Sequence, residues 1–220
     1  MMQKYQNKQG ILDAVEREDE HHLIKHAEFL KRIKSGPIEL LFLGDSIIRR
    51  WEENLEVWNY YFKKYAPANF GVGGDTTQNL KWRILNGELE GIDPGIIVLL
   101  IGTNNLPSHN ETEIVPAIKD IVEIIHKKLP QAKIVLMGIL PRNTDDTGRD
   151  YMKMIVFINQ ELKKLEEKEY LNYLDIGKEY IGSDGKVIDK LMPDGLHLVE
   201  PGYKIWGSLL LPLIERIHSA

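Results

Sequence analysis

The stretch that decides the fold reads LLFLGDSI at residues 40–47. Its first half does not alternate polar and apolar residues, which favours a strand buried on both faces of a sheet. The apolar run spans residues 38–43, and residues 47–63 beyond it show the apolar spacing typical of a helix. A buried strand that runs into a helix is the unit from which parallel sheets are built. This stretch therefore predicts an α/β fold.

The same alternation of strand and helix continues along the rest of the chain. Further runs rich in Ile, Val and Leu occur at residues 68–72, 96–101, 134–140 and 170–176. Helix-like stretches separate or follow them at residues 76–89, 111–129 and 149–168, and a last one follows Pro201. Strands that alternate with helices indicate a parallel sheet covered on both faces. We expect one domain over residues 38–220, with five parallel strands in three α/β/α layers.

The residues before the first strand, 1–37, are predicted to add a helix to this domain. Apolar side chains recur between charged ones over residues 11–34 at roughly helical spacing. The sequence Ser35-Gly36-Pro37 then ends the pattern. We expect an amphipathic helix that packs on the same domain.

Composition restricts the classes of function. The chain has 220 residues, a formal net charge of -5 and no cysteine. An acidic chain without a basic stripe argues against a nucleic-acid partner. The lack of cysteine excludes disulfides, thiol nucleophiles and thiolate zinc sites. No stretch resembles a signal-peptide core or approaches a membrane span of about 20 apolar residues. We therefore expect a cytoplasmic protein.

Polar residues and glycines follow three of the predicted strands, in Gly44-Asp45-Ser46, Gly73-Gly74-Asp75 and Gly102-Thr103-Asn104. The carboxyl ends of parallel strands meet at one edge of the sheet, where ligands bind in such folds. The Ser46 N–H, a backbone N–H of Gly73-Gly74 and the Asn104 amide could together bind the oxyanion of an acyl intermediate. Singly, each has a plainer explanation as a helix cap or a turn residue.

A base for Ser46 can be found in the segment PDGLHL, at residues 193–198. Asp194 stands three residues before His197 and can hydrogen-bond the Nδ1 atom of that imidazole from the same loop. The Nε2 atom is then free to take the serine proton. In isolation, this pair is more typical of a solvated loop, and it supplies only two of the ligands that a metal site needs.

Taken together, four blocks resemble a known family. They are GDS at residues 44–46, NFGVGGDTT at 69–77, GTNN at 102–105 and DGLHL at 194–198. In this order the blocks resemble the GDSL or SGNH hydrolase superfamily, and within it the catalytic subunits of intracellular platelet-activating-factor acetylhydrolase and their bacterial relatives. The stretch WRILNGEL, at residues 82–89, resembles that family as well. The first block continues as GDSI instead of GDSL, which exchanges one aliphatic residue for another.

The resemblance implies a flavodoxin-like sheet and a serine esterase that cleaves short, acetyl-sized acyl esters. It implies a triad of Ser46, Asp194 and His197, with Gly74 and Asn104 in the oxyanion hole. No metal or cofactor is expected, because a serine mechanism needs no ion. The expected substrate is a small ester, such as an acetylated sugar, a lipid fragment or a metabolite, and the resemblance suggests a homodimer.

Other functions remain open at this point. The same fold could serve as a non-catalytic binding or scaffold subunit. Asp45, Asp75 and His197 could instead support metal-assisted phosphoester hydrolysis. The sequence GVGGDT, at residues 71–76, approaches a dinucleotide fingerprint but lacks its last glycine and follows the second strand.

The remaining histidines are weaker candidates. His21, His22 and His26 invite a metal hypothesis, but a solvated helix face is the simpler interpretation because charged residues surround them. His109 follows the third block and is a candidate for bordering the pocket.

Overall fold

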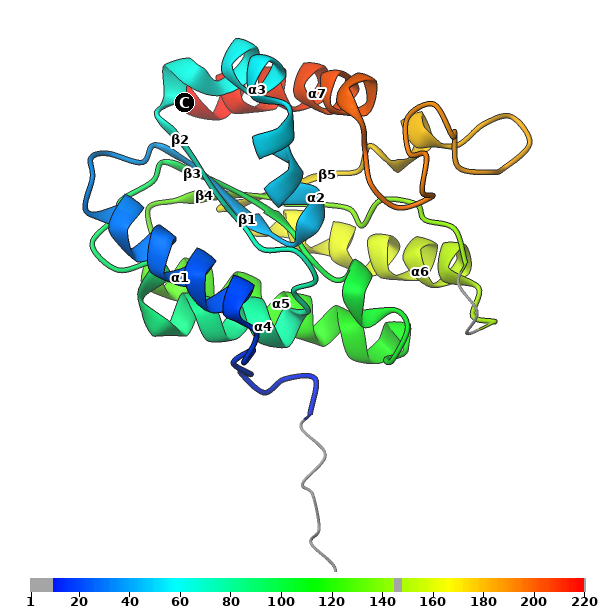
Figure 1. Ribbon diagram of the computed structural model, residues 1–220, viewed down its shortest axis with the longest axis horizontal. Coiled ribbons are helices and arrows are strands. Elements are labelled where there is room, and N and C mark those ends of the chain that lie inside the picture. The colour runs from blue at the N-terminus through cyan, green and yellow to red at the C-terminus, as the bar shows by residue number, and fades with distance from the viewer. Residues whose placement is uncertain (1–9, 145–147, 220) are drawn as a thin grey trace, which may run out of the picture.

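The computed structural model describes residues 10–144 and 148–219. A single sheet forms the middle layer of the described chain (Figure 1). Its strands are β1 (Leu40–Gly44), β2 (Pro67–Gly71), β3 (Ile96–Leu100), β4 (Lys133–Met137) and β5 (Leu171–Leu174). All neighbouring pairs are parallel, in the order β2-β1-β3-β4-β5. This is the strand order of flavodoxin-like folds. The prediction of a five-stranded parallel α/β sheet is confirmed.

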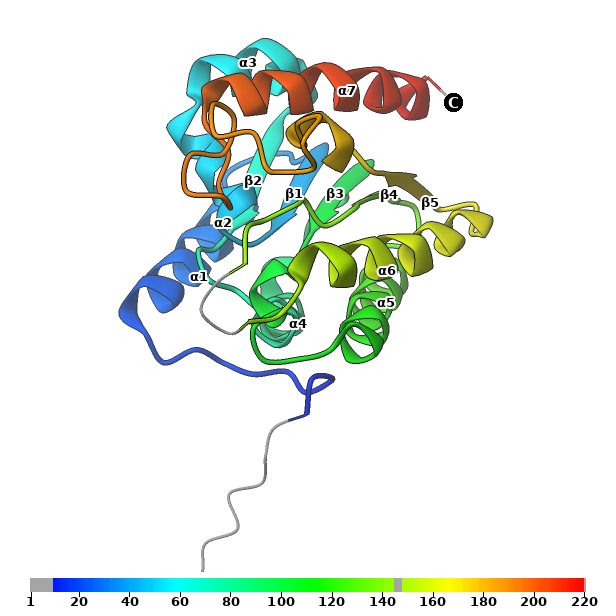
Figure 2. The ribbon, with the colours of Figure 1, turned by 90° about the vertical axis from the view of Figure 1, so that its right-hand side faces the viewer.

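Helices cover both faces of the sheet (Figures 1 and 2). One face carries α1 (Glu20–Ile33), α4 (Thr77–Arg83), α5 (Glu111–Lys128) and α6 (Tyr151–Lys163). The other face carries α2 (Ser46–Arg49), α3 (Leu55–Phe62) and α7 (Glu200–His218). Buried apolar side chains form one core on each side, which is why the central strands are apolar throughout. Within the described residues, none of the helices has the length and apolarity of a bilayer span.

The predicted helix over residues 11–34 is wrong in its first half. Helix α1 begins only at Glu20, because the Asp19 side chain accepts a hydrogen bond from the His22 N–H at 3.0 Å and so caps the helix there. Residues 10–19, which we name the N-terminal strap, run in irregular conformation along α4. The Val15 N–H donates to the Gln78 carbonyl at 3.1 Å. The first nine residues of the predicted amino-terminal segment, 1–37, lie outside the described residues.

Other predicted boundaries shift by a few residues or break. The stretch 47–63 contains α2, a 3-10 turn at Arg50–Glu53 and α3, instead of one helix. The stretch 76–89 divides into α4 and a π-type turn, Ile84–Glu88. The stretch 149–168 forms α6 and the 3-10 turn Lys164–Glu167. Further short 3-10 turns are Lys63–Tyr65, Thr103–Asn105 and Gly177–Tyr180.

Two glycines let the strand ends crowd together beneath the site. A Cβ at Gly44 would lie 2.0 Å from the Leu100 carbonyl oxygen on β3. A Cβ at Gly71 would lie 2.2 Å from the Arg49 nitrogen at the end of α2. Gly44 also pairs with Gly71 in the register of β1 and β2. Because these two glycines have no side chain, the carboxyl ends of β1, β2 and β3 and the helix α2 can approach closely at one edge of the sheet.

Candidate active site

Three side chains from distant segments meet at this edge. The Ser46 Oγ lies 2.9 Å from the His197 Nε2. The His197 Nδ1 lies 2.7 Å from the Asp194 Oδ2. Ser46 opens α2, and the other two residues lie in the loop that precedes α7. The imidazole therefore links a hydroxyl on one side to a carboxylate on the other, which is the arrangement by which a base activates an alcohol.

The loop of Asp194 organises itself through its own backbone. The Asp194 Oδ1 accepts hydrogen bonds from the Leu196 N–H at 3.0 Å and the His197 N–H at 2.7 Å. Partial burial raises the pKa of Asp194, but the hydrogen bonds from His197 and Leu196 outweigh it and lower the pKa to about 2. This carboxylate is therefore ionised near neutral pH and fixes which ring nitrogen of His197 faces Ser46.

Ser46 itself is not the helix cap that a lone serine at this position would suggest. The cap is Asp45, whose Oδ1 accepts a hydrogen bond from the Ile47 N–H at 2.9 Å. The Ser46 hydroxyl is therefore free to face His197, and Ser46 remains 8% exposed. Burial raises the pKa of Asp45 to about 7, and its Oδ2 has no hydrogen-bond partner among the described residues.

The loop that carries one predicted oxyanion residue, Gly74, lies beside Ser46, and the other predicted residue, Asn104, bonds to that loop. A Cβ built on Gly73 would lie 4.0 Å from the Ser46 Cβ, so the loop after β2 passes directly beside the serine. Gly74 has a φ of +80°, a conformation that favours glycine. The Asn104 Nδ2 donates to the Asp75 carbonyl at 2.9 Å. An amide carries two hydrogens, so one remains to be donated elsewhere.

A buried ion network lies behind this loop and was missed by the sequence analysis. The Asp75 Oδ1 lies 2.9 Å from the Arg17 Nη1, and the Asp75 Oδ2 lies 2.8 Å from the Arg83 Nε. Arg83 also pairs with Glu88, and the side chains of Asp75, Arg83 and Glu88 are 0% exposed. The available signal was WRILNGEL, which contains Arg83 and Glu88 and resembles the family outside the catalytic blocks.

The chain matches a known protein family over most of its length. Residues 42–205 match the GDSL-like lipase/acylhydrolase family. The chain belongs to this family. Rat platelet-activating factor acetylhydrolase IB subunit alpha2 is 36% identical over 203 residues, which cover 90% of this chain and 87% of the rat protein. The human alpha2 subunit is 35% identical with the same coverage.

A solved structure shows the same fold at lower identity. The crystal structure of a GDSL-like lipase from Bacteroides thetaiotaomicron superposes with a TM-score of 0.70 and 18% identity. It covers 87% of this chain and 97% of the Bacteroides chain. This likeness bears on the arrangement of the sheet and helices, and it agrees with the fold expected for the family.

Within this family member, the amino-terminal histidines are not the solvated face that we expected. His22 is 0% exposed, and its Nε2 lies 3.7 Å from the Asp75 Oδ1. The His26 Nδ1 lies 2.8 Å from the Glu88 Oε1. Both rings lie near the Trp82 ring, at centroid distances of 5.8 and 5.0 Å. Only His21 is exposed, so His22 and His26 dock α1 onto the ion network.

The set of residues considered for metal-assisted chemistry does not converge. Both carboxylate oxygens of Asp75 are engaged by arginines, and Asp45 is buried as a helix cap. No group of three or more His, Asp or Glu side chains that could hold a metal ion is found in the part of the chain that the structure describes. His109 is half-buried and contacts the Ser108 hydroxyl at 3.0 Å.

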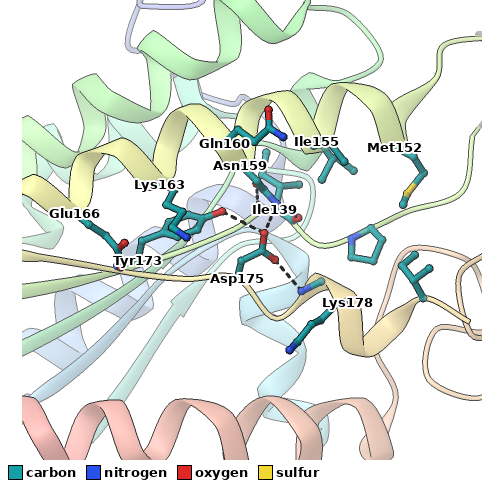
Figure 3. Close-up of a pocket in the computed structure, with 14 residues that line it drawn as sticks. Ile139, Met152, Ile155, Asn159, Gln160, Lys163, Glu166, Tyr173, Asp175 and Lys178 are labelled. Atoms are coloured by element: carbon teal, nitrogen blue, oxygen red, sulfur yellow. Dashed lines mark hydrogen bonds between the residues drawn. The ribbon is translucent and has the colours of Figure 1, made fainter. Parts of the chain in front are cut away.

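A separate cavity of about 540 Å³ lies at the carboxyl ends of β4 and β5 (Figure 3). Its walls come from α6 and the loops after these two strands, and Ser46, Asp194 and His197 do not line it. Asp175 lies in its wall and accepts hydrogen bonds from Gly177 N–H at 2.8 Å and Asn159 Nδ2 at 3.2 Å. The cavity is therefore distinct from the serine site.

Proposed function

We propose that this chain is a serine esterase that hydrolyses short acyl esters, with Ser46 as the nucleophile. The hydrogen-bond chain from Ser46 through His197 to Asp194 is the observation that carries the proposal. It supplies a nucleophile, a base and a group that orients the base. Membership in the acylhydrolase family supports the same reaction class.

In this proposal, His197 takes the Ser46 proton as the serine oxygen attacks the ester carbonyl. The tetrahedral intermediate collapses, the carbon–oxygen bond to the alcohol breaks, and His197 gives its proton to the departing alcohol. Water then attacks the acyl-serine with His197 as base again, which releases the acid and restores Ser46. Asp194 stabilises the imidazolium that forms in each half of the cycle.

Hydrogen-bond donors next to Ser46 stabilise the negative charge that forms on the carbonyl oxygen of the ester. We assign this role to the Ser46 and Gly74 N–H groups and to the second hydrogen of the Asn104 amide. The closeness of Gly73 to the Ser46 Cβ and the bond from Asn104 to Asp75 support the assignment. Donors fixed before the reaction stabilise the transition state without a reorganisation cost.

The substrate is proposed to be an acetyl or similarly short ester. The alpha2 relatives carry the name acetylhydrolase, which supports a small acyl group. The alcohol is proposed to be a small partner such as a sugar, a lipid fragment or a metabolite. The cytoplasmic location, the homodimer and the division at residue 37 stay predictions.

The test compares wild type with Ser46→Ala on a chain-length series of p-nitrophenyl esters. We expect wild type to favour short chains and Ser46→Ala to lose a factor of roughly 10⁴ to 10⁶ in kcat. Ser208→Ala, on the exposed side of α7, is the matched control and should keep full activity.

Three results would contradict the proposal. Comparable hydrolysis by wild type and Ser46→Ala would remove Ser46 from the reaction, and a wild type without esterase activity would favour a binding or scaffold role. Loss of activity on adding a chelator would favour the metal-assisted alternative, whereas we expect the chelator to change nothing.

A further inference from the structure

Arg17, in the N-terminal strap, reaches the loop that holds Gly74. Its Nη1 donates to the Gly73 carbonyl at 2.6 Å and to the Asp75 Oδ1 at 2.9 Å. The same atom would lie 3.3 Å from a Cβ built on Gly74. The guanidinium therefore lies against the Gly74 backbone, beside the serine, although 56 residues separate Arg17 from Gly73 in the sequence.

The position of this hydrogen bond matters because of peptide geometry. The carbonyl of Gly73 and the N–H of Gly74 belong to one peptide group, which is planar and rigid. A donor that holds the carbonyl oxygen therefore also fixes the direction of the N–H on the other side of the bond. A charged donor also polarises the amide, and such chains of hydrogen bonds strengthen by about 10–30% per bond.

Besides Arg17, one backbone hydrogen bond restrains this peptide, because the Asp75 N–H donates to the Val72 carbonyl at 3.3 Å and closes the turn around it. Glycines at positions 73 and 74 leave the backbone unusually free, and Gly74 needs a positive φ. Among the described residues, Arg17 is the donor found for the Gly73 carbonyl. Arg83 holds the next residue, Asp75, only through its side chain.

Arg17 is itself held in place. Its Nε donates to the Asp19 Oδ2 at 2.7 Å, and Asp19 caps α1. The strap is further attached to α4, because the Asn79 Nδ2 donates to the Val15 carbonyl at 3.0 Å. The side chain of Arg17 remains 25% exposed, so it occupies a defined position that small solutes can still reach.

We propose that Arg17 is a positioning residue of the oxyanion hole, which aims and polarises the Gly73–Gly74 peptide from the N-terminal strap. The inference rests on the proposed esterase function. Arg17 does not touch the substrate in this role. Its contribution should appear in the rate of the chemical step and much less in substrate binding, because the oxyanion forms only in the transition state.

The experiment measures kcat and KM of Arg17→Ala and Arg17→Lys with p-nitrophenyl acetate. Arg17→Ala should lose roughly 10- to 100-fold in kcat, less than the 10²–10³ typical of a deleted oxyanion donor, with KM nearly unchanged. Arg17→Lys should lose less, since an ammonium can still donate to the Gly73 carbonyl. Guanidinium chloride, well below denaturing concentrations, should restore part of the kcat of Arg17→Ala, whereas equal sodium chloride should not.

The matched control is Lys81→Ala, which releases the same strap without touching the loop. The Lys81 Nζ donates to the Leu12 carbonyl at 2.6 Å and pairs with Asp120. If Arg17 only anchors the strap, both alanine variants should lose activity equally and guanidinium should rescue neither. That result, or an Arg17→Ala kcat within about threefold of wild type, would overturn the inference. If Arg17→Ala does not fold, Arg17→Met decides, because it removes the donor but keeps most of the length of the side chain, and wild-type kcat in that variant would overturn the inference as well.

Failure of the proposed function gives a different result. In that case wild type and Ser46→Ala would hydrolyse the ester at the same rate. A rate that depends on Ser46 but not on Arg17 would leave the esterase standing and remove only the role of Arg17.

Discussion

The two sides of the serine are held in position by different means. On the base side, Asp194 and His197 are three residues apart, and the loop between them supplies its own hydrogen bonds. On the oxyanion side, Gly73 and Asp75 are held by Arg17, which lies 56 and 58 residues away in the sequence. The base side can therefore be recognised in the sequence as a short motif. The contacts of the oxyanion side form only when distant segments meet in the folded chain.

The electrostatics of the two sides differ in the same way. The Asp194 side chain is 51% exposed, and hydrogen bonds lower its pKa to about 2, although burial opposes this. The Asp75 side chain is 0% exposed and depends on Arg17 and Arg83 for charge balance. Removing the Asp194 charge should therefore affect mainly catalysis, whereas removing the buried Arg83 charge should affect mainly stability.

The largest expected effect is on the base side, in Asp194→Asn. The asparagine can still accept the backbone bonds but presents a donor to the His197 Nδ1, which favours the wrong tautomer at Nε2. We expect kcat to fall by about 10⁴, as for other triads, with unfolding free energy within about 1 kcal/mol of wild type.

Asp184→Asn is the control for this change, since Asp184 makes a similar local bond to the Lys186 N–H at 3.1 Å in an exposed turn. A loss of less than about tenfold in Asp194→Asn, measured with p-nitrophenyl acetate, would show that the carboxylate does not orient His197.

On the oxyanion side, Arg83→Met should mainly destabilise the fold. The change leaves the carboxylates of Asp75 and Glu88 buried without their shared cation. Breaking a buried pair in this way typically costs about 3–5 kcal/mol. Lys64→Met, which breaks the exposed pair with Glu215, should destabilise the fold far less, because solvent screens that pair. Urea unfolding followed by circular dichroism measures both variants, and equal costs would mean that Arg83 is not the anchor described.

The same contrast explains what the sequence could and could not predict. The unbroken apolar runs predicted the parallel sheet, because a strand covered on both faces has no polar side. The blocks around Ser46 and His197 predicted residues that the structure does bring together, because their spacing is short or lies at strand ends. The pairing of Asp75 with Arg17 has no such local signature, since it depends on how the strap crosses the sheet edge.

The N-terminal strap shows why a helical pattern can mislead. Apolar residues at positions 11, 12 and 15 fit a helix in the sequence. They nevertheless precede the cap at Asp19, and α1 begins only at Glu20. The backbone of Val15 instead bonds to Gln78 and Asn79. A local propensity was overridden by contacts with a helix more than 60 residues further along the chain.

Asp45 connects the two sides and offers the smallest and most specific test. It follows β1, the strand between β2 and β3, and burial raises its pKa to about 7, with a further increase from the Asp75 carboxylate. An acid whose folded pKa is raised above its unfolded value of about 3.9 binds its proton more tightly in the native state. Its contribution to stability is complete below the unfolded pKa and is lost as pH rises toward the folded pKa.

Asp45→Asn keeps the bond to the Ile47 N–H and has no proton to lose. Between pH 6 and pH 8, wild type should therefore lose on the order of 1 kcal/mol of unfolding free energy relative to Asp45→Asn. Urea unfolding at a series of pH values measures this difference, and Asp189→Asn, at an exposed position, should run parallel to wild type. If wild type and Asp45→Asn also run parallel, Asp45 is already ionised at pH 6 and the Asp75 charge does not reach across β1. The oxyanion network would then be electrically isolated from Ser46, and its effect on the site would be limited to holding the Gly73–Asp75 loop.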